Sequence, residues 1–373
     1  MKNKKFKKNL KYWAGRVHLW LGLLTGIVVL IVALTGCIYV FHDEIKDAIH
    51  DYRFVQEEQT LYLQPSKIKE IVQENYPGTT DDFVIYTGKD RPVAVYGVYE
   101  ETPYYFYVNP YTGEFLYAQD FTKDFFEIVK ALHMYLLLPP TIGKQIVGAS
   151  TLIFILMLIT GVILWWPKKL KNLRKSLSVK WNSRWRRINY DLHNVSGFYL
   201  HILAIIVAIT GLYFSYEWVS DGLYFVGNFG QDVESDHHIE DIVHKPRISE
   251  DPVDIAFYET IQLEPTNDMY FVWTEGDHHP VVTGAYPKSL HFDHQSNYYF
   301  HPQTGELLQS QPYANKSTGM KIQEMSYGIH TGQFFNLPGK IIAFILSLFV
   351  ASLPISGFLI WWGRKNRMKH LVK

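Results

Sequence analysis

The sequence predicts a membrane protein with four transmembrane α-helices that come from a tandem repeat, joined to two external α+β domains. Three observations support this fold class: four long apolar blocks, charges sorted by sign, and an internal repeat. A bilayer core about 30 Å thick needs roughly 20 consecutive apolar residues per helix. The blocks at 17–41, 142–166, 195–216 and 341–362 reach that length and contain no Asp, Glu or Arg.

The charges between the blocks predict the orientation. Residues 1–16 carry seven Lys or Arg, residues 167–190 carry nine and residues 363–373 carry five, and none of these segments holds an acid. Positively charged segments are retained in the cytoplasm. We therefore expect both termini and the central loop to be cytoplasmic, with their basic side chains near membrane lipid. The two long intervening segments are then external.

The two halves of the chain repeat one another. LITGVILWWPKK at 158–169 returns as PISGFLIWWGRK at 354–365, and YVNPYTGEFL at 107–116 returns as YFHPQTGELL at 299–308. Each half crosses the membrane twice, so the halves are expected to be related by a pseudo-two-fold axis along the membrane normal. The repeated double tryptophan and basic cluster mark the points where the second helix of each half leaves the membrane on the cytoplasmic side.

The repeat and the charges together predict nine segments along the chain. In order they are a basic tail (1–16), a first span (17–42), a first external domain (43–132), a second span with its outer lead-in (133–166), a basic loop (167–192), a third span (193–216), a second external domain (217–329), a fourth span with its lead-in (330–362) and a tail (363–373).

Each external segment reads as a helix followed by strands. Residues 65–78 have the apolar period of an amphipathic helix that ends at Pro-Gly, and 250–261 are the candidate in the second half. The runs that follow are rich in β-branched and aromatic residues, and the NPYTG turn favours a hairpin. We expect a helix against a small antiparallel sheet. The single cysteine, Cys37, lies in the first span, so the external domains contain no disulfide.

Histidines carry the candidate chemistry of the membrane region. Polar groups at membrane depth are costly and usually mark a function. Imidazole is a ligand of haem iron, and helix bundles build such sites from facing side chains. The repeat pairs His18 with His193 near the cytoplasmic face and His133 with His330 near the outer face.

Two further histidines, His201 and His42, are candidate ligands of a haem iron. His201 lies roughly 12 Å further into the third span than His193 and could replace one inner ligand, while His42 ends the first span on the outer side. The alternative for every one of these six residues is an interfacial anchor or a helix cap. No CxxCH motif occurs in the sequence, so a haem here would be non-covalent and b-type.

The second external domain is also rich in histidine. These residues either contact iron or an iron chelate or belong to a solvated, loop-rich surface; they are His237, His238, His244, His278, His279, His291, His294 and His301.

The ordered motifs resemble a known family. HLWLGLLTG…ALTG, LHMYLLLPPTIGK…TGVILWW, DLHNVSGFY…AITG and IHTGQFFNLPGK…SGFLIWW are similar to the PepSY-associated transmembrane proteins of bacteria, and the YTGE and QTGE hairpins are similar to their PepSY domains. That family includes iron-regulated membrane proteins and ferric-siderophore reductases. The resemblance covers nearly the whole chain.

The resemblance implies a haem-binding protein of the bacterial cytoplasmic (inner) membrane that passes electrons outward to a ferric siderophore or another iron chelate. It implies haem b, in two non-covalent copies, with the family's helix-end histidines falling on His18, His133, His193 and His330. His42 and His201 are additional candidates. The cytoplasmic segments contain no GxGxxG after a strand, so we expect the electron donor to be a separate cytoplasmic protein or a membrane quinol.

Two other functions compete with this prediction. The chain could be a transporter of iron or haem, although its spans carry few ionisable side chains apart from the histidines. It could also be a non-catalytic envelope protein whose external domains bind or regulate a peptidase or another partner. Nucleic-acid binding is not expected, because the basic runs are short and are explained by topology. GxSxG and HExxH, which would indicate hydrolysis, do not occur.

Overall fold

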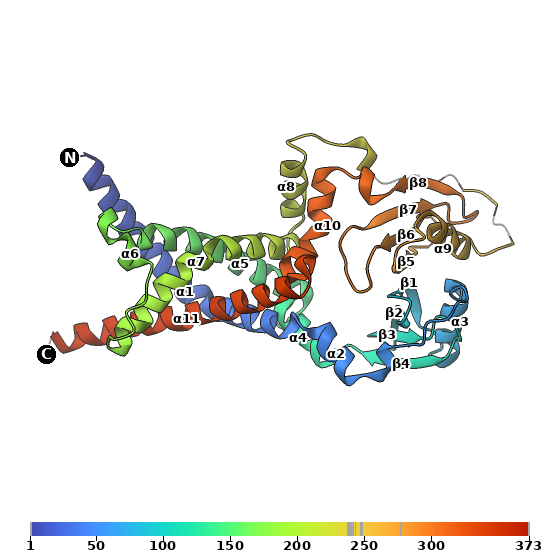
Figure 1. Cartoon of the computed structure of the whole chain (residues 1–373), viewed down its shortest axis with the longest axis horizontal. Coiled ribbons are helices and arrows are strands. Elements are labelled where there is room, and N and C mark those ends of the chain that lie inside the picture. The colour runs from blue at the N-terminus through green and yellow to red at the C-terminus, as the bar shows by residue number, and fades with distance from the viewer. Residues whose placement is uncertain (1, 237–241, 243, 247–248, 277, 372–373) are drawn as a thin grey trace. The chain divides into compact units, whose positions relative to one another are not determined.

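The computed structural model of the chain describes residues 2–236, 242, 244–246, 249–276 and 278–371, and the chain divides into two compact units (Figure 1). The first unit consists of residues 1–41, 129–220 and 329–373, and the second of residues 42–128 and 221–328. Two of the expected external histidines, His237 and His238, lie outside the described residues.

The first unit is a bundle of four long helices, α1 (Lys2–Tyr39), α5 (Pro140–Trp165), α7 (Trp185–Tyr213) and α11 (Asn336–Leu371). Helices α1 and α7 each pack against both α5 and α11, so α1 faces α7 across the bundle and α5 faces α11. Within the described residues, four helices are long and apolar enough to cross a membrane, and each includes most of one apolar block predicted from the sequence: Asn9–Tyr39, Pro140–Trp165, Trp185–Tyr213 and Gln333–Lys365.

The bundle has the inside-to-outside pattern of a membrane protein. Its interior is formed by small and medium side chains such as Ala33, Ala204 and Ala208, together with Phe154 and Leu346. Small residues allow helices to approach closely where lipid, rather than water, surrounds them. Large apolar residues of the four helices are exposed instead, among them Leu24, Ile27, Leu156, Ile202 and Leu348.

The helices extend beyond the apolar blocks. Helix α1 begins at Lys2 and so includes most of the basic tail, α7 begins at Trp185, and α11 continues to Leu371. Lys and Arg are good helix formers, so the basic flanks continue the helical conformation. At the opposite end of the bundle the helices do not extend in this way. There, α5 and α11 are each preceded by a separate short helix, α4 (Phe125–Tyr135) and α10 (Thr318–Thr331).

The second unit contains one sheet of eight antiparallel strands in the order β4-β3-β2-β1-β5-β6-β7-β8. The strands are β1 (Thr80–Tyr86), β2 (Val93–Tyr99), β3 (Thr102–Val108), β4 (Phe115–Asp120), β5 (Met269–Trp273), β6 (Val281–Tyr286), β7 (Ser296–Phe300) and β8 (Leu307–Gln311). Each half of the chain supplies four of them in hairpin order, as the turn motifs predicted.

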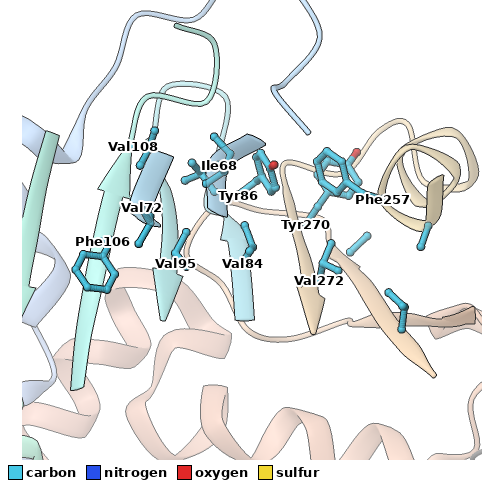
Figure 2. Close-up of a cluster of buried hydrophobic side chains, with 14 of the residues drawn as sticks. Ile68, Val72, Val84, Tyr86, Val95, Phe106, Val108, Phe257, Tyr270 and Val272 are labelled. Carbon is cyan, nitrogen blue, oxygen red and sulfur yellow. The ribbon is translucent and has the colours of Figure 1, made fainter. Parts of the chain in front are cut away.

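Two helices pack on this sheet, α3 (Pro65–Asn75) and α9 (Pro252–Leu263), where the sequence predicted them. Their apolar faces meet strand residues in a shared core, and Figure 2 shows Ile68 and Val72 of α3 and Phe257 of α9 beside Tyr86 and Val84. The helices also contact each other directly. Fully buried aliphatic and aromatic side chains of this kind supply most of the stability of such a core.

The two four-stranded sheets join at their inner edges, which the sequence did not predict. Strand β1 pairs with β5 along four residue pairs, from Phe83–Trp273 to Tyr86–Tyr270. Pairing of these two edges satisfies backbone groups that two separate sheets would leave open. The other short helices are α2 (His42–Ile49), α6 (Leu173–Ser176) and α8 (Glu217–Gly227), with short 3₁₀ turns at Asp51–Arg53, Leu170–Asn172, Glu234–Asp236, Tyr313–Asn315 and Gln333–Phe335.

Candidate functional site

The structure brings four of the six candidate histidines together as two pairs in the helix bundle. The ring centres of His18 and His193 are 6.3 Å apart with their planes at 87°. The ring centres of His133 and His330 are 6.0 Å apart with their planes at 67°. These are the two pairs that the repeat predicted.

Each pair crosses the bundle. His18 lies on α1 and His193 on α7, which face each other across the bundle. His133 lies near the end of α4 and His330 near the end of α10, the helices that lead into the facing pair α5 and α11. Side chains on facing helices are the usual source of cofactor ligands in helix bundles.

The outer histidines return to the bundle through tight connections. Leu136 and Leu137 both have positive φ, at 57° and 56°, and turn the chain between α4 and α5. A Cβ on Gly143 would collide with the carbonyl oxygen of Tyr135 in the last turn of α4, and a Cβ on Gly339 would collide with that of Gly332. These contacts explain why the LPPTIGK and LPGK motifs follow His133 and His330.

The two pairs lie at different depths. His133 contacts Thr35 of α1, and Thr35 follows His18 by 17 residues in the same helix. A rise of 1.5 Å per residue places the two levels about 25 Å apart along α1. His193 and Thr210, which contacts His330, have the same spacing on α7. Both levels therefore fit within a hydrocarbon core of about 30 Å.

A cavity of about 720 Å³ adjoins the inner pair. Its wall contains His18, His193 and Arg364, together with aliphatic side chains from α1, α5 and α11. Six glycines from the four helices keep the wall open, and they are Gly15, Gly22, Gly26, Gly161, Gly197 and Gly357. A volume of this size lies within the range of about 300–1,000 Å³ that is typical of cofactor and ligand sites.

The free nitrogen of each ring can be identified from its partners. Nδ1 of His18 lies 3.1 Å from the carbonyl oxygen of Met157, and Nδ1 of His133 lies 2.9 Å from that of Val32. Nδ1 of His330 is in the same way 2.9 Å from the Val207 carbonyl oxygen. A carbonyl oxygen only accepts, so Nδ1 is the donor and Nε2 of the neutral ring keeps its lone pair.

His193 has an equivalent arrangement. Its Nδ1 lies 2.8 Å from the Ser356 hydroxyl oxygen and also bonds to the Leu353 backbone. In the part of the chain that the structure describes, no hydrogen bond reaches Nε2 of His18, His133, His193 or His330. Metal-binding histidines usually donate one ring N–H to a backbone carbonyl in this way while the other nitrogen binds the metal.

The distances fit a metal held between two rings. An imidazole nitrogen binds a transition metal at about 2.0–2.1 Å, so two rings on opposite sides of one metal have centres roughly 6 Å apart. The described residues contain no group of three or more His, Cys, Asp or Glu side chains that could hold a metal. Haem supplies the other ligands of its iron from its own flat macrocycle, so two facing imidazoles at this distance would fit it.

The other two candidates lie elsewhere. His201 is on α7, its Nδ1 contacts the Phe198 carbonyl oxygen, and its ring stacks on Phe198, but it is not part of the cavity wall. His42 begins α2 in the second unit, where its Nε2 is 3.4 Å from Asp43 and its ring faces Phe126.

The cavity wall also contains residues that sequence reasoning passed over. Trp165 and Phe198 stack face to face, with ring centres 3.5 Å apart, and both line the cavity. Trp165 belongs to the double tryptophan that we interpreted only as a membrane-interface marker. Tyr190, one turn before His193, and Asn194, the residue directly after it, also line the cavity. The spacing of Tyr190 from that histidine was the available signal.

Four apolar spans around two histidine pairs, with a cavity beside one of the pairs, define a helical membrane protein. The chain matches the family model of the PepSY-associated TM region over residues 15–364, and it belongs to that family. This confirms the family that the motifs resembled. No curated protein matches the chain.

Proposed function

We propose that this protein is a b-type haem protein of the bacterial inner membrane that carries electrons outward and reduces a ferric siderophore or another iron chelate. The observation that supports it best is the presence of two cross-bundle histidine pairs, with ring centres 6.3 and 6.0 Å apart, at two depths of one apolar bundle. A redox carrier that spans a low-dielectric core needs sites near both faces.

The residues of this chain have defined parts in that proposal. His18 and His193 would hold the inner haem, and His133 and His330 the outer one. When bound, haem supplies one-electron redox chemistry, whose potential depends on axial ligands, burial and hydrogen bonding. The protein keeps each Nε2 unprotonated, excludes water with an apolar wall and fixes the ring positions.

The basic segments predict the direction of electron transfer across the membrane. Residues 1–16, 167–190 and 363–373 lie in the cytoplasm by the positive-inside bias, so the His18–His193 level is the cytoplasmic one. The second unit and the His133–His330 level then face outward. The donor is a separate cytoplasmic protein or a quinol, and the acceptor is Fe(III) in a chelate, which takes one electron and leaves the chelate more readily as Fe(II).

Optical spectroscopy of the detergent-purified protein, made with ample haemin, tests the proposal. We expect low-spin b-type bands that sharpen on reduction with dithionite, and two haems per chain. His18→Ala and His133→Ala should each remove about half of the bound haem, because each change removes one of the two histidines that would hold the haem at that level. His201→Ala is the matched control, since that ring lies outside both pairs, and its spectrum should equal that of the wild type.

Other results would support the competing functions. A colourless protein that moves iron into liposomes would indicate a transporter. Membrane histidines that can be replaced without effect in cells, together with an indispensable second unit, would indicate a partner-binding envelope protein.

A further inference from the structure

Each of the four paired histidines contacts a hydroxyl residue that is followed by glycine. The hydroxyl oxygen lies 2.8–3.2 Å from Nδ1 of the ring in every case. The four contacts are His18 with Thr160, His133 with Thr35, His193 with Ser356 and His330 with Thr210. The glycines that follow are Gly161, Gly36, Gly357 and Gly211.

The glycines make room for the rings. A Cβ on Gly36 would lie 3.3 Å from Cε1 of His133, and a Cβ on Gly211 would lie 3.0 Å from Cε1 of His330. The corresponding distances for Gly161 and Gly357 are 3.5 and 3.3 Å, to His18 and His193. In each of the four contacts the ring lies directly on the helix backbone at the glycine.

The hydroxyl groups have one orientation in common. Thr35 donates its own hydrogen to a backbone carbonyl of α1, at 2.7 Å from Ile31 or 3.0 Å from Val32, and Thr160, Thr210 and Ser356 do the same in their helices. A hydroxyl whose hydrogen is used in this way presents its lone pairs to the ring. It therefore accepts from the imidazole Nδ1–H, beside the carbonyl oxygen that already accepts from it.

The contacts are reciprocal within each half of the chain. Helix α1 carries His18 and the Thr35-Gly36 step, while α4 and α5 carry His133 and the Thr160-Gly161 step. The second half has the same exchange between α7 and the α10–α11 pair. Each half thus holds its own two rings in place, whereas each His–His pair joins the two halves.

We propose that Thr35, Thr160, Thr210 and Ser356, each with its following glycine, are positioning residues that fix the rotation of the four ligand rings and add a second acceptor to the Nδ1–H that each backbone carbonyl oxygen already binds. The proposal rests on the proposed haem ligation for the identity of the metal. An acceptor on Nδ1–H increases the donor strength of Nε2 and stabilises the oxidised metal. At Gly36, Gly211 and Gly357 the glycine removes a Cβ that would crowd the ring, whereas a Cβ at Gly161 would make an ordinary contact.

Two other threonines of the spans serve as controls. Thr25 and Thr151 bond back to their own helices, at 3.0 Å from the Leu21 carbonyl oxygen and 2.9 Å from the Val147 carbonyl oxygen, and neither makes a hydrogen bond to a histidine among the described residues. Back-bonding of this kind is common for threonine in helices. A substitution there tests the general effect of losing a membrane threonine.

The test compares isosteric variants at one level of the bundle. Thr35→Val should keep the outer haem but raise its midpoint potential, while leaving the inner haem unchanged; Thr35→Ser should restore the wild-type potential. Gly36→Ala should lower the occupancy of the outer site. Thr25→Val should change neither site. Equal potentials in Thr35→Val and wild type, with full occupancy in Gly36→Ala, would overturn the proposal.

A second measurement does not depend on haem. Nitrogen NMR of histidine-labelled, haem-free protein should show the Nδ1–H tautomer for the four rings, identified by single His→Gln changes. In Thr35→Val the Nδ1 signal of His133 should shift and broaden, because the Val32 carbonyl oxygen remains as an acceptor while the hydroxyl that fixes the ring rotation is lost. A wild-type protein that binds no haem contradicts the proposed function, and the His133 signal still decides the positioning role. An unchanged His133 signal in Thr35→Val would refute that role alone.

Discussion

The ring of His133 lies 6.0 Å from the ring of His330, centre to centre, although the two residues come from opposite halves of the chain. Each ring reaches the bundle because its short helix folds back on the following span, where Gly143 and Gly339 allow close contact. The outer pair therefore depends on two backbone contacts outside the histidines themselves.

Gly143→Ala tests that dependence. The added methyl group would collide with the Tyr135 carbonyl oxygen, so we expect α4 to shift and His133 to leave its ligand position. The purified variant should keep about half of the haem, all of it at the inner level. Gly363→Ala is the control, because a Cβ there meets no atom within 4 Å. Full haem occupancy in Gly143→Ala would show that the tight connection does not position the ligand.

Two substitutions of different size at Gly26 test whether the inner cavity holds a haem. A Cβ at this position would lie at an ordinary contact distance, 3.5 Å from Cβ of Pro354, so Gly26→Ala should bind two haems. Gly26→Phe should fill the cavity and remove the inner haem while the outer one remains. Haem content per chain, measured after extraction, checks the difference between the two variants. Equal content in both would mean that the cavity is not the cofactor site.

The pH dependence of the second unit can be predicted from Asp47. Burial by itself raises the pKa of this carboxyl, but hydrogen bonds from Arg91 and Arg53 outweigh it and hold the pKa below the ordinary value of 3.8. Arg91 donates from both terminal nitrogens, at 2.7 Å each. A lowered pKa contributes stability that is present above 3.8 and is lost as the pH falls through the folded-state value.

Asp47→Asn should therefore lower the thermal midpoint of the second unit at pH 7, and the difference from wild type should shrink as the pH falls below 3.8. Tryptophan fluorescence during heating follows the transition through Trp273 on β5. A difference that stays constant or grows on acidification would contradict the sign of the shift.

The shared core of the sheet gives a stability prediction. Phe257 is fully buried, at 0% exposure, and its ring stacks on Tyr86 at 4.3 Å (Figure 2). Phe257→Ala should destabilise the second unit by about 3–5 kcal/mol, through lost burial and the cavity left behind. Chemical unfolding followed at Trp273 measures the change, and exposed Phe225→Ala on α8 is the control. Haem spectra should stay unchanged, because the bundle has its own core.

The sequence was sufficient for the features that repeat along the chain. Apolar length predicted the four spans. Runs of β-branched and aromatic residues with their turn motif predicted the strands, and a helical candidate in each half predicted α3 and α9. The repeat also paired His18 with His193 and His133 with His330 without any structural information. Each of these features depends on local pattern or on symmetry, which a single sequence shows.

Contacts between distant segments were not predictable in the same way. Nothing in strands β1 or β5 indicates that Phe83 pairs with Trp273, since both strands carry ordinary β-forming residues. The Thr35-Gly36 and Thr210-Gly211 steps were visible as repeat markers, yet their contact with His133 and His330 requires the fold. His201 was a candidate ligand because of its depth in the third span, yet it is not part of the cavity wall. Depth along a helix does not tell which side of the helix a ring occupies.

Electron paramagnetic resonance of the oxidised, purified protein tests the central claim most directly, because it reports the axial ligands of each ferric haem. We predict two low-spin signals with the large anisotropy that strongly inclined imidazole planes produce, as the 87° and 67° ring angles indicate. His18→Ala should remove one signal and His330→Ala the other. A colourless protein, or high-spin signals that these substitutions leave unchanged, would contradict the account.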